Sequence, residues 1–149
     1  MGDFNTVDDI LDFAIKEEEA AYEFYAGLAA KASSGMKEAF EAFAAEERGH
    51  KAKLVDIRGG KKILMGKETI LDLKIADYLV EVEASPRMSY RDALILAMKK
   101  EKAAFRMYTD LAQRTHGSLR DTFLGLAQEE ARHKLRFEVE YDDDVLKEA

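Results

Sequence analysis

The feature of this sequence that most limits its possible folds is an internal repeat. Residues 6–54 align without a gap with residues 89–137, at an offset of 83 positions. The coincident residues include polar as well as apolar types: Glu18 with Glu101, Tyr25 with Tyr108, Phe40 with Phe123, Glu47 with Glu130, and His50 with His133. Duplication explains a match of this extent, so the two halves are expected to share one structure.

Each half of the repeat predicts a helical hairpin. The 149 residues include one Pro and nine Gly, and Ala, Glu, Lys and Leu are frequent, a composition typical of long helices. Thr6-x-x-Asp9 and Ser89-x-x-Asp92 both have the pattern of a helix N-cap with an acid in the first turn. We predict helices at residues 7–32, 36–58, 90–115 and 119–141.

The two hairpins, at about residues 6–58 and 89–141, are joined by a long connection at residues 59–88. Residues 70–82 of this connection have apolar side chains at helical spacing and predict a short extra helix. A connection of this length can run along a bundle, so that all four long helices lie side by side. We therefore expect residues 1–149 to form one all-α domain, a four-helix bundle of the ferritin-like type.

A polar layer interrupts the apolar stripe of each predicted helix at the same height in both repeats. The interrupting residues are Glu18 in the first helix, Glu47 and His50 in the second, Glu101 in the third, and Glu130 and His133 in the fourth. A carboxylate in a helical core without a partner costs several kcal/mol, and the stripes contain no Lys or Arg to pair with the four Glu side chains. Two divalent cations among them would neutralise the charge.

The spacing of these residues matches a known arrangement of metal ligands. Glu47 and His50, like Glu130 and His133, are three residues apart and project from one side of a helix. One Glu from each of two helices plus Glu-x-x-His from each of the other two is the ligand set of di-iron bundles. Mixed oxygen and imidazole ligands suit Fe or Mn, and Zn is also compatible. A structural Zn or Mn site and a metal-free bundle remain as alternatives, because a single Glu-x-x-His usually marks a solvated helix face.

Two tyrosines near this layer have two interpretations each, and two further Glu residues have one. Tyr25 and Tyr108 follow the lone Glu of their helix by seven residues, so they fill the core or also bond a metal-bound carboxylate. Glu46 and Glu129 precede the predicted ligands and point about 100° away from them, so we expect them to be surface residues.

Composition excludes several classes of function. The chain has no Cys, which removes disulfides, thiolate-bound metals and a built-in rubredoxin-type iron centre. A net charge of −7 argues against nucleic acid as a partner. The sequence has no signal-peptide pattern and no apolar stretch long enough to span a membrane, so we expect a cytoplasmic protein.

Together these motifs resemble the rubrerythrin branch of the ferritin-like superfamily. The resemblance rests on Glu-x-x-Ala-x-x-x-Tyr at Glu18 and Glu101, with Glu-x-x-His at Glu47 and Glu130, and it covers nearly the whole chain. It implies that Glu18, Glu47, His50, Glu101, Glu130 and His133 bind two iron ions that react with peroxide or dioxygen. It also implies a homodimer and a role in oxidative stress.

The sequence departs from this family in two respects. The rubredoxin domain that supplies electrons in rubrerythrins is missing, so the resemblance implies a separate electron-donor protein. Rubrerythrins also tend to carry an extra Glu one turn after the ligand of the third helix, where this chain has Ala104. This second departure makes the site more symmetric and leaves open a second function, non-enzymatic iron binding or storage in a ferritin-like assembly.

Overall fold

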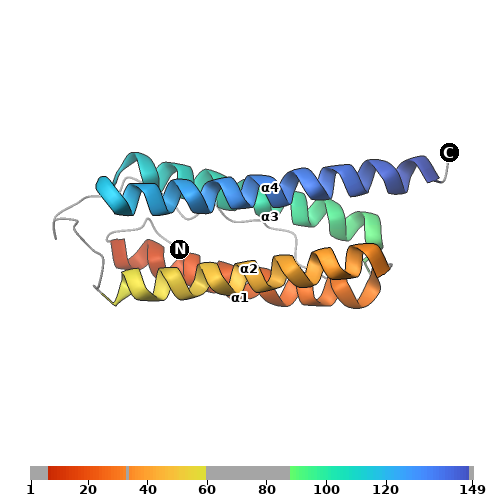
Figure 1. Cartoon of the computed structure of the whole chain (residues 1–149), viewed down its shortest axis with the longest axis horizontal. Coiled ribbons are helices and arrows are strands. Elements are labelled where there is room, and N and C mark those ends of the chain that lie inside the picture. The colour runs from red at the N-terminus through yellow and green to blue at the C-terminus, as the bar shows by residue number, and fades with distance from the viewer. Residues whose placement is uncertain (1–6, 33, 60–87, 148–149) are drawn as a thin grey trace.

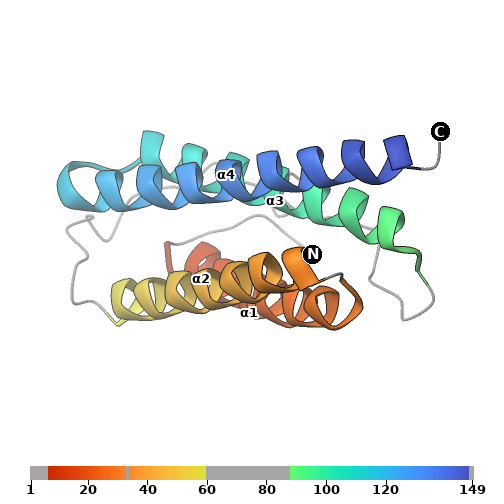
Figure 2. The ribbon, with the colours of Figure 1, turned by 45° about the vertical axis from the view of Figure 1, so that its right-hand side comes forward.

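The computed structural model describes residues 7–32, 34–59 and 88–147, which form four long helices. These are α1 (Val7–Lys31), α2 (Ser34–Arg58), α3 (Tyr90–Gln113) and α4 (Gly117–Lys147). Helices α1 and α2 form one antiparallel hairpin and α3 and α4 form another, and the two hairpins lie one over the other (Figures 1 and 2). The predicted four-helix bundle of two repeated hairpins is therefore confirmed.

Local contacts fix both ends of α3 and the start of α4. The Ser89 side chain accepts a hydrogen bond of 3.1 Å from the Asp92 backbone N–H, which confirms the predicted N-cap of α3. Arg114 ends the helix, and its backbone N–H bonds the Leu111 carbonyl at 3.1 Å. Gly117 then begins α4 with a φ of 60°, a conformation that costs glycine little.

Helix α4 is longer than the sequence predicted. It continues to Lys147, whereas we expected it to end at Tyr141. Arg91, in the first turn of α3, donates hydrogen bonds to the Asp144 carboxylate at 2.8 Å and to the Asp144 carbonyl at 2.9 Å. These contacts hold the last turns of α4 against α3, although three consecutive Asp residues near a helix C-terminus are unfavourable for the helix dipole.

Within the described residues, the buried apolar side chains form two clusters. One cluster includes Leu11, Leu54, Tyr108 and Phe123 from all four helices. The other includes Tyr25, Phe40, Phe43, Leu94 and Phe137, also drawn from all four. The candidate ligands belong to neither cluster, so the described helices have apolar packing on both sides of a polar layer.

Two predicted features lie outside the described residues. They are the Thr6 cap and nearly all of the connection between the hairpins, which includes the predicted short helix at residues 70–82. Among the helices described, none is both long enough and apolar enough to cross a membrane.

Candidate metal centre

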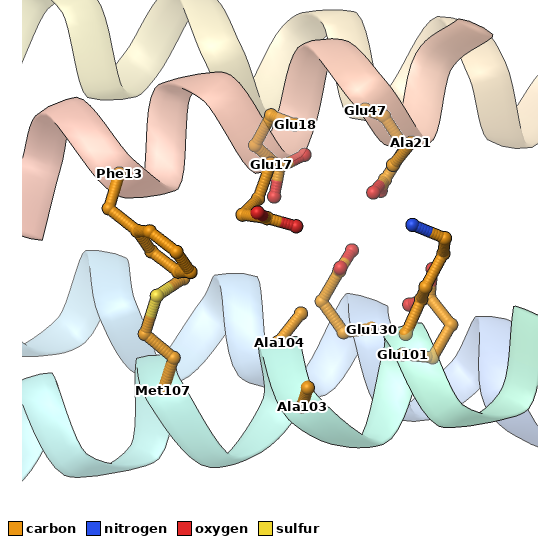
Figure 3. Close-up of a pocket in the computed structure, with 11 residues that line it drawn as sticks. Phe13, Glu17, Glu18, Ala21, Glu47, Glu101, Ala103, Ala104, Met107 and Glu130 are labelled. Carbon is orange, nitrogen blue, oxygen red and sulfur yellow. The ribbon is translucent and has the colours of Figure 1, made fainter. Parts of the chain in front are cut away.

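All six predicted ligands are buried and converge in the polar layer of the bundle. Each of them has at most 3% of its surface exposed: Glu18, Glu47, His50, Glu101, Glu130 and His133. Helix α1 contributes one of them, α2 two, α3 one and α4 two, as the repeat requires. Figure 3 shows Glu18, Glu47, Glu101 and Glu130 directed from the two hairpins towards the same space.

The ligand atoms divide into two groups that share two carboxylates. One group is Glu18, Glu47, His50 and Glu130, and the other is Glu47, Glu101, Glu130 and His133. Within each group one atom of every residue lies within 4.8 Å of the others. Glu47 and Glu130 belong to both groups, so each would link two neighbouring ions. The arrangement is therefore a candidate site for a pair of ions.

The distances within the first group fit a cation at its centre. His50 Nδ1 lies 3.4 Å from a Glu18 oxygen, 3.3 Å from a Glu47 oxygen and 3.2 Å from a Glu130 oxygen. Ligand atoms about 2.1 Å from one ion are separated from each other by about 3.0–3.5 Å in tetrahedral or octahedral geometry.

The second group is slightly wider but has the same form. His133 Nδ1 lies 3.5, 3.7 and 3.8 Å from oxygens of Glu47, Glu101 and Glu130. The rings of His50 and His133 are nearly parallel, at 12°, with their centroids 6.5 Å apart. The two groups thus face one another in an arrangement close to the symmetry of the repeat.

Several buried polar atoms in this layer have no hydrogen-bond partner among the described residues. They are Nδ1 of both histidines, both oxygens of Glu47, and one oxygen each of Glu18, Glu101 and Glu130. Leaving buried polar groups unpaired is costly, and folded proteins rarely do so. Because these atoms are the same ones that form the two groups, the residues present fit two bound cations.

The layer is electrostatically strained when no cation is bound. Burial and the neighbouring carboxylates raise the pKa of Glu47 to about 7, and the same causes raise the pKa of Glu130 well above its usual value. Burial alone would lower the pKa of His50, but the nearby carboxylates of Glu18 and Glu47 raise it to about 11. Each raised pKa favours the protonated form, so protons would compete with a cation for these atoms.

Two tyrosines hold ligand carboxylates across the bundle. The Tyr108 hydroxyl on α3 donates a hydrogen bond of 2.5 Å to Glu18 on α1, and the Tyr25 hydroxyl on α1 donates to Glu101 on α3. Both rings are fully buried, so each tyrosine fills the core and also orients a candidate ligand. Burial, followed by the charge of the carboxylates, raises the pKa of both hydroxyls and keeps them protonated donors.

We expected Glu46 and Glu129 to be surface residues, and about a third of each side chain is exposed, but both also contact candidate ligands. Both side chains are half-buried, and each carboxylate bonds the Nε2 atom of a candidate ligand on the opposite hairpin, Glu46 to His133 and Glu129 to His50. A carboxylate at Nε2 orients the ring and leaves Nδ1 directed at the cation. The repeat gave a signal for these residues, because Glu46 and Glu129 are equivalent positions that carry the same side chain.

A narrow cavity connects this layer to the space between α1 and α3 (Figure 3). Its inner wall includes the buried carboxylates of Glu18, Glu47, Glu101 and Glu130, whereas half-buried side chains of Phe13, Glu17 and Lys100 line its outer part. The cavity measures about 30 Å³, room for one or two water-sized molecules. Ala104, the repeat equivalent of Ala21, lies on its wall. Sequence analysis did not identify this opening.

Comparison with known proteins agrees with the fold. Residues 9–141 match the family described as rubrerythrin. A crystal structure from Thermotoga maritima, described as that of a ferritin-like diiron-carboxylate protein, superposes with a TM-score of 0.82. It is 21% identical in sequence, and the match covers 95% of this chain and 98% of the other. Among curated proteins, none matches the sequence.

Proposed function

The chain belongs to the rubrerythrin family, and we propose from this that it is a di-iron protein that reduces hydrogen peroxide or dioxygen. The observation that carries the proposal is the pair of ligand groups that share Glu47 and Glu130. Two shared carboxylates would hold two ions close enough to act on one small molecule. Mixed carboxylate and imidazole ligands favour iron or manganese.

The chemistry would come from the metal, and the protein would hold and shield it. Two bound ferrous ions would supply the two electrons that, with two protons, reduce one peroxide molecule to two water molecules. Tyr25 and Tyr108 would keep the Glu101 and Glu18 carboxylates in place during this change, through the hydrogen bonds that their hydroxyls donate. The apolar clusters on either side of the layer would exclude bulk water.

The size of the cavity supports a small oxidant rather than an organic substrate. A volume of about 30 Å³ accepts peroxide or dioxygen and is too small for a metabolite. The chain has no Cys, so it has no thiolate-bound iron centre of its own to return electrons to the site. Repeated turnover would therefore require a separate electron-donor protein.

Rapid mixing of the reduced, iron-loaded protein with peroxide tests this proposal. We expect two iron ions per chain to be oxidised, and the absorbance of the ferric product measures this oxidation. One peroxide molecule should be consumed for every two iron ions oxidised. The variant Glu130→Ala should bind fewer than two ions and lose the reaction. A protein that holds two ferrous ions and is oxidised by neither peroxide nor dioxygen would contradict the proposal.

Light scattering separates this function from iron storage. A storage protein of the ferritin type needs a large hollow assembly, whereas the proposed redox reaction needs only the ligand layer within one chain. We expect a small oligomer, with the homodimer as the expected form, and a loading limit of two ions per chain. A cage that takes up many more ions per chain would favour storage instead.

A further inference from the structure

The cavity beside the metal centre contains the one pair of opposite charges that breaks the symmetry of the repeat around it. Glu17 on α1 and Lys100 on α3 are equivalent positions in the two halves, at the offset of 83 residues. The neighbouring positions on the cavity wall keep the same side chain in both halves: Glu18 matches Glu101, and Ala21 matches Ala104. Glu19 and Lys102 show the same reversal of charge at the next position but one, yet only Glu17 and Lys100 of these four line the cavity, so they are the two that can act on what passes through it.

Both charged side chains lie where they can act on a passing ion. Glu17 and Lys100 are half-buried and line the cavity, and the charges of Lys100 and Glu18 both act on the Glu17 carboxylate. Figure 3 shows the Glu17 carboxylate beside that of Glu18 and directed into the cavity. Lys100 Nζ lies 5.7 Å from the centroid of the Phe24 ring on α1, so this side chain extends from α3 across to α1.

The inner end of the cavity attracts cations. Oxygens of Glu18, Glu47, Glu101 and Glu130 that face it have no hydrogen-bond partner within residues 7–32, 34–59 and 88–147. A cation that approaches these oxygens from between α1 and α3 meets Glu17 first, because Glu17 is half-buried and Glu18 is buried. A carboxylate at this place lowers the electrostatic barrier for a cation, and an ammonium group raises it.

We propose that Glu17 is the residue that admits divalent metal ions to the site, through the opening between α1 and α3, and that Lys100 opposes it. Glu17 acts on the rate at which a metal ion enters, whereas Glu18 and the other five buried ligands determine how many ions are held. The role rests on the metal site of the proposed function, but it does not depend on which oxidant the bound iron meets.

Rates of metal uptake test this role without any redox reaction. Metal-free protein is mixed with Co²⁺ in a stopped-flow instrument, and the visible absorbance of the bound ion is followed. We expect Glu17→Gln to slow uptake about 3- to 10-fold, and Lys100→Gln to accelerate it by a similar factor. Both variants should still bind two ions, with the absorbance spectrum of the unaltered protein.

A matched control removes the effect of overall charge. Glu23→Gln deletes one negative charge from an exposed position of the same helix, away from the cavity. It should leave the uptake rate within about twofold of the original. At high ionic strength the difference between Glu17→Gln and Glu23→Gln should shrink, because salt screens charges at a partly exposed site.

Oxidation of the loaded protein gives an independent readout. The reaction of peroxide or dioxygen with unaltered protein that already holds two ferrous ions does not involve metal uptake. Equal uptake rates in Glu17→Gln and Glu23→Gln would overturn the role of Glu17 in uptake. Loss of a bound ion in Glu17→Gln would also overturn it, since it would make Glu17 a ligand. Failure of the loaded protein to oxidise would count against the proposed function alone.

Discussion

Glu46 makes two contacts that its position on α2 alone does not predict. Its carboxylate bonds His133 Nε2 and also accepts a hydrogen bond of 2.8 Å from Arg132, and both partners lie on α4. One residue of a helix is turned about 100° from the next, so Glu46 cannot face the same space as Glu47. It reaches instead towards the neighbouring hairpin, and its place in the site depends on the spacing between α2 and α4.

Removal of this carboxylate should weaken metal binding without removing a ligand. In Glu46→Ala, His133 loses the group that fixes its ring, and the loss of such a partner lowers metal affinity about 10- to 100-fold. Competition with a coloured chelator measures the change. Glu41→Ala, at an exposed position of the same helix, is the control and should keep the original affinity. Unchanged affinity in Glu46→Ala would show that α4 holds the His133 ring without help.

The tyrosine hydroxyls should contribute to stability even when no metal is bound. Tyr25→Phe removes the donor to Glu101, and Tyr108→Phe removes the donor to Glu18. A buried carboxylate oxygen left without its donor costs about 1–3 kcal/mol. Urea unfolding of the metal-free proteins should show a loss of that size in each variant. Tyr22→Phe, where the ring is half-buried and lies under Arg48, should change the free energy of unfolding by less than about 0.5 kcal/mol.

At the scale of the helices, the stripes of the sequence predicted most of what the structure contains. Glu18, His50 and their repeat equivalents were placed correctly because a fixed spacing of three or four residues decides which side chains share a helix face. The same reasoning could not place Glu129 or the cavity beside Ala104, because both depend on how one helix faces another. The end of α4 was missed for a related reason, since it depends on Arg91 of another helix.

The contact of Arg91 with Asp144 should hold the last turns of α4 in place. Arg91→Ala removes both hydrogen bonds to Asp144, a pair that is about 30% exposed on each side. We expect a small loss of global stability, about 0.5–1 kcal/mol, because the pair is partly solvated. Amide exchange at residues 142–147 should accelerate markedly more than in the centre of α4. Lys102→Ala, an exposed charge deletion on α3, should leave this exchange unchanged.

At the scale of the whole molecule, the metal layer joins the two hairpins. Each ligand group combines side chains of both: Glu130 of the second hairpin joins Glu18, Glu47 and His50 of the first, and the other group mixes them in the same way. Bound ions would therefore stabilise the packing of one hairpin on the other, as well as each hairpin by itself. Any ligand that binds only the folded protein raises its stability by mass action. The size of this effect should depend on pH, because protons occupy the same atoms.

The sign of that dependence follows from the raised pKa values. The pKa of Glu47 is about 7 in the folded, metal-free protein because of burial and neighbouring carboxylates, above its ordinary value of 4.5. The folded state therefore binds a proton that the unfolded state releases between pH 4.5 and 7, and metal-free stability should fall as pH rises through this range. The histidine contribution has the same sign. His50 has a pKa of about 11 in the folded protein against an ordinary value of 6.5, so the stabilisation that its charge provides declines as pH rises from 6.5 to 11.

Metal binding should show the opposite trend, because each cation must displace these protons. We expect the difference in melting temperature between protein with excess Mn²⁺ and protein with a chelator to widen from pH 5 to pH 8, by about 5 °C or more. The difference is a better measure than either temperature alone, because exposed Asp and Glu residues titrate equally in both samples. The variant Glu47→Gln removes the shared carboxylate and should flatten the dependence. A difference that stays constant or narrows with rising pH would mean that protons and cations do not compete for this layer.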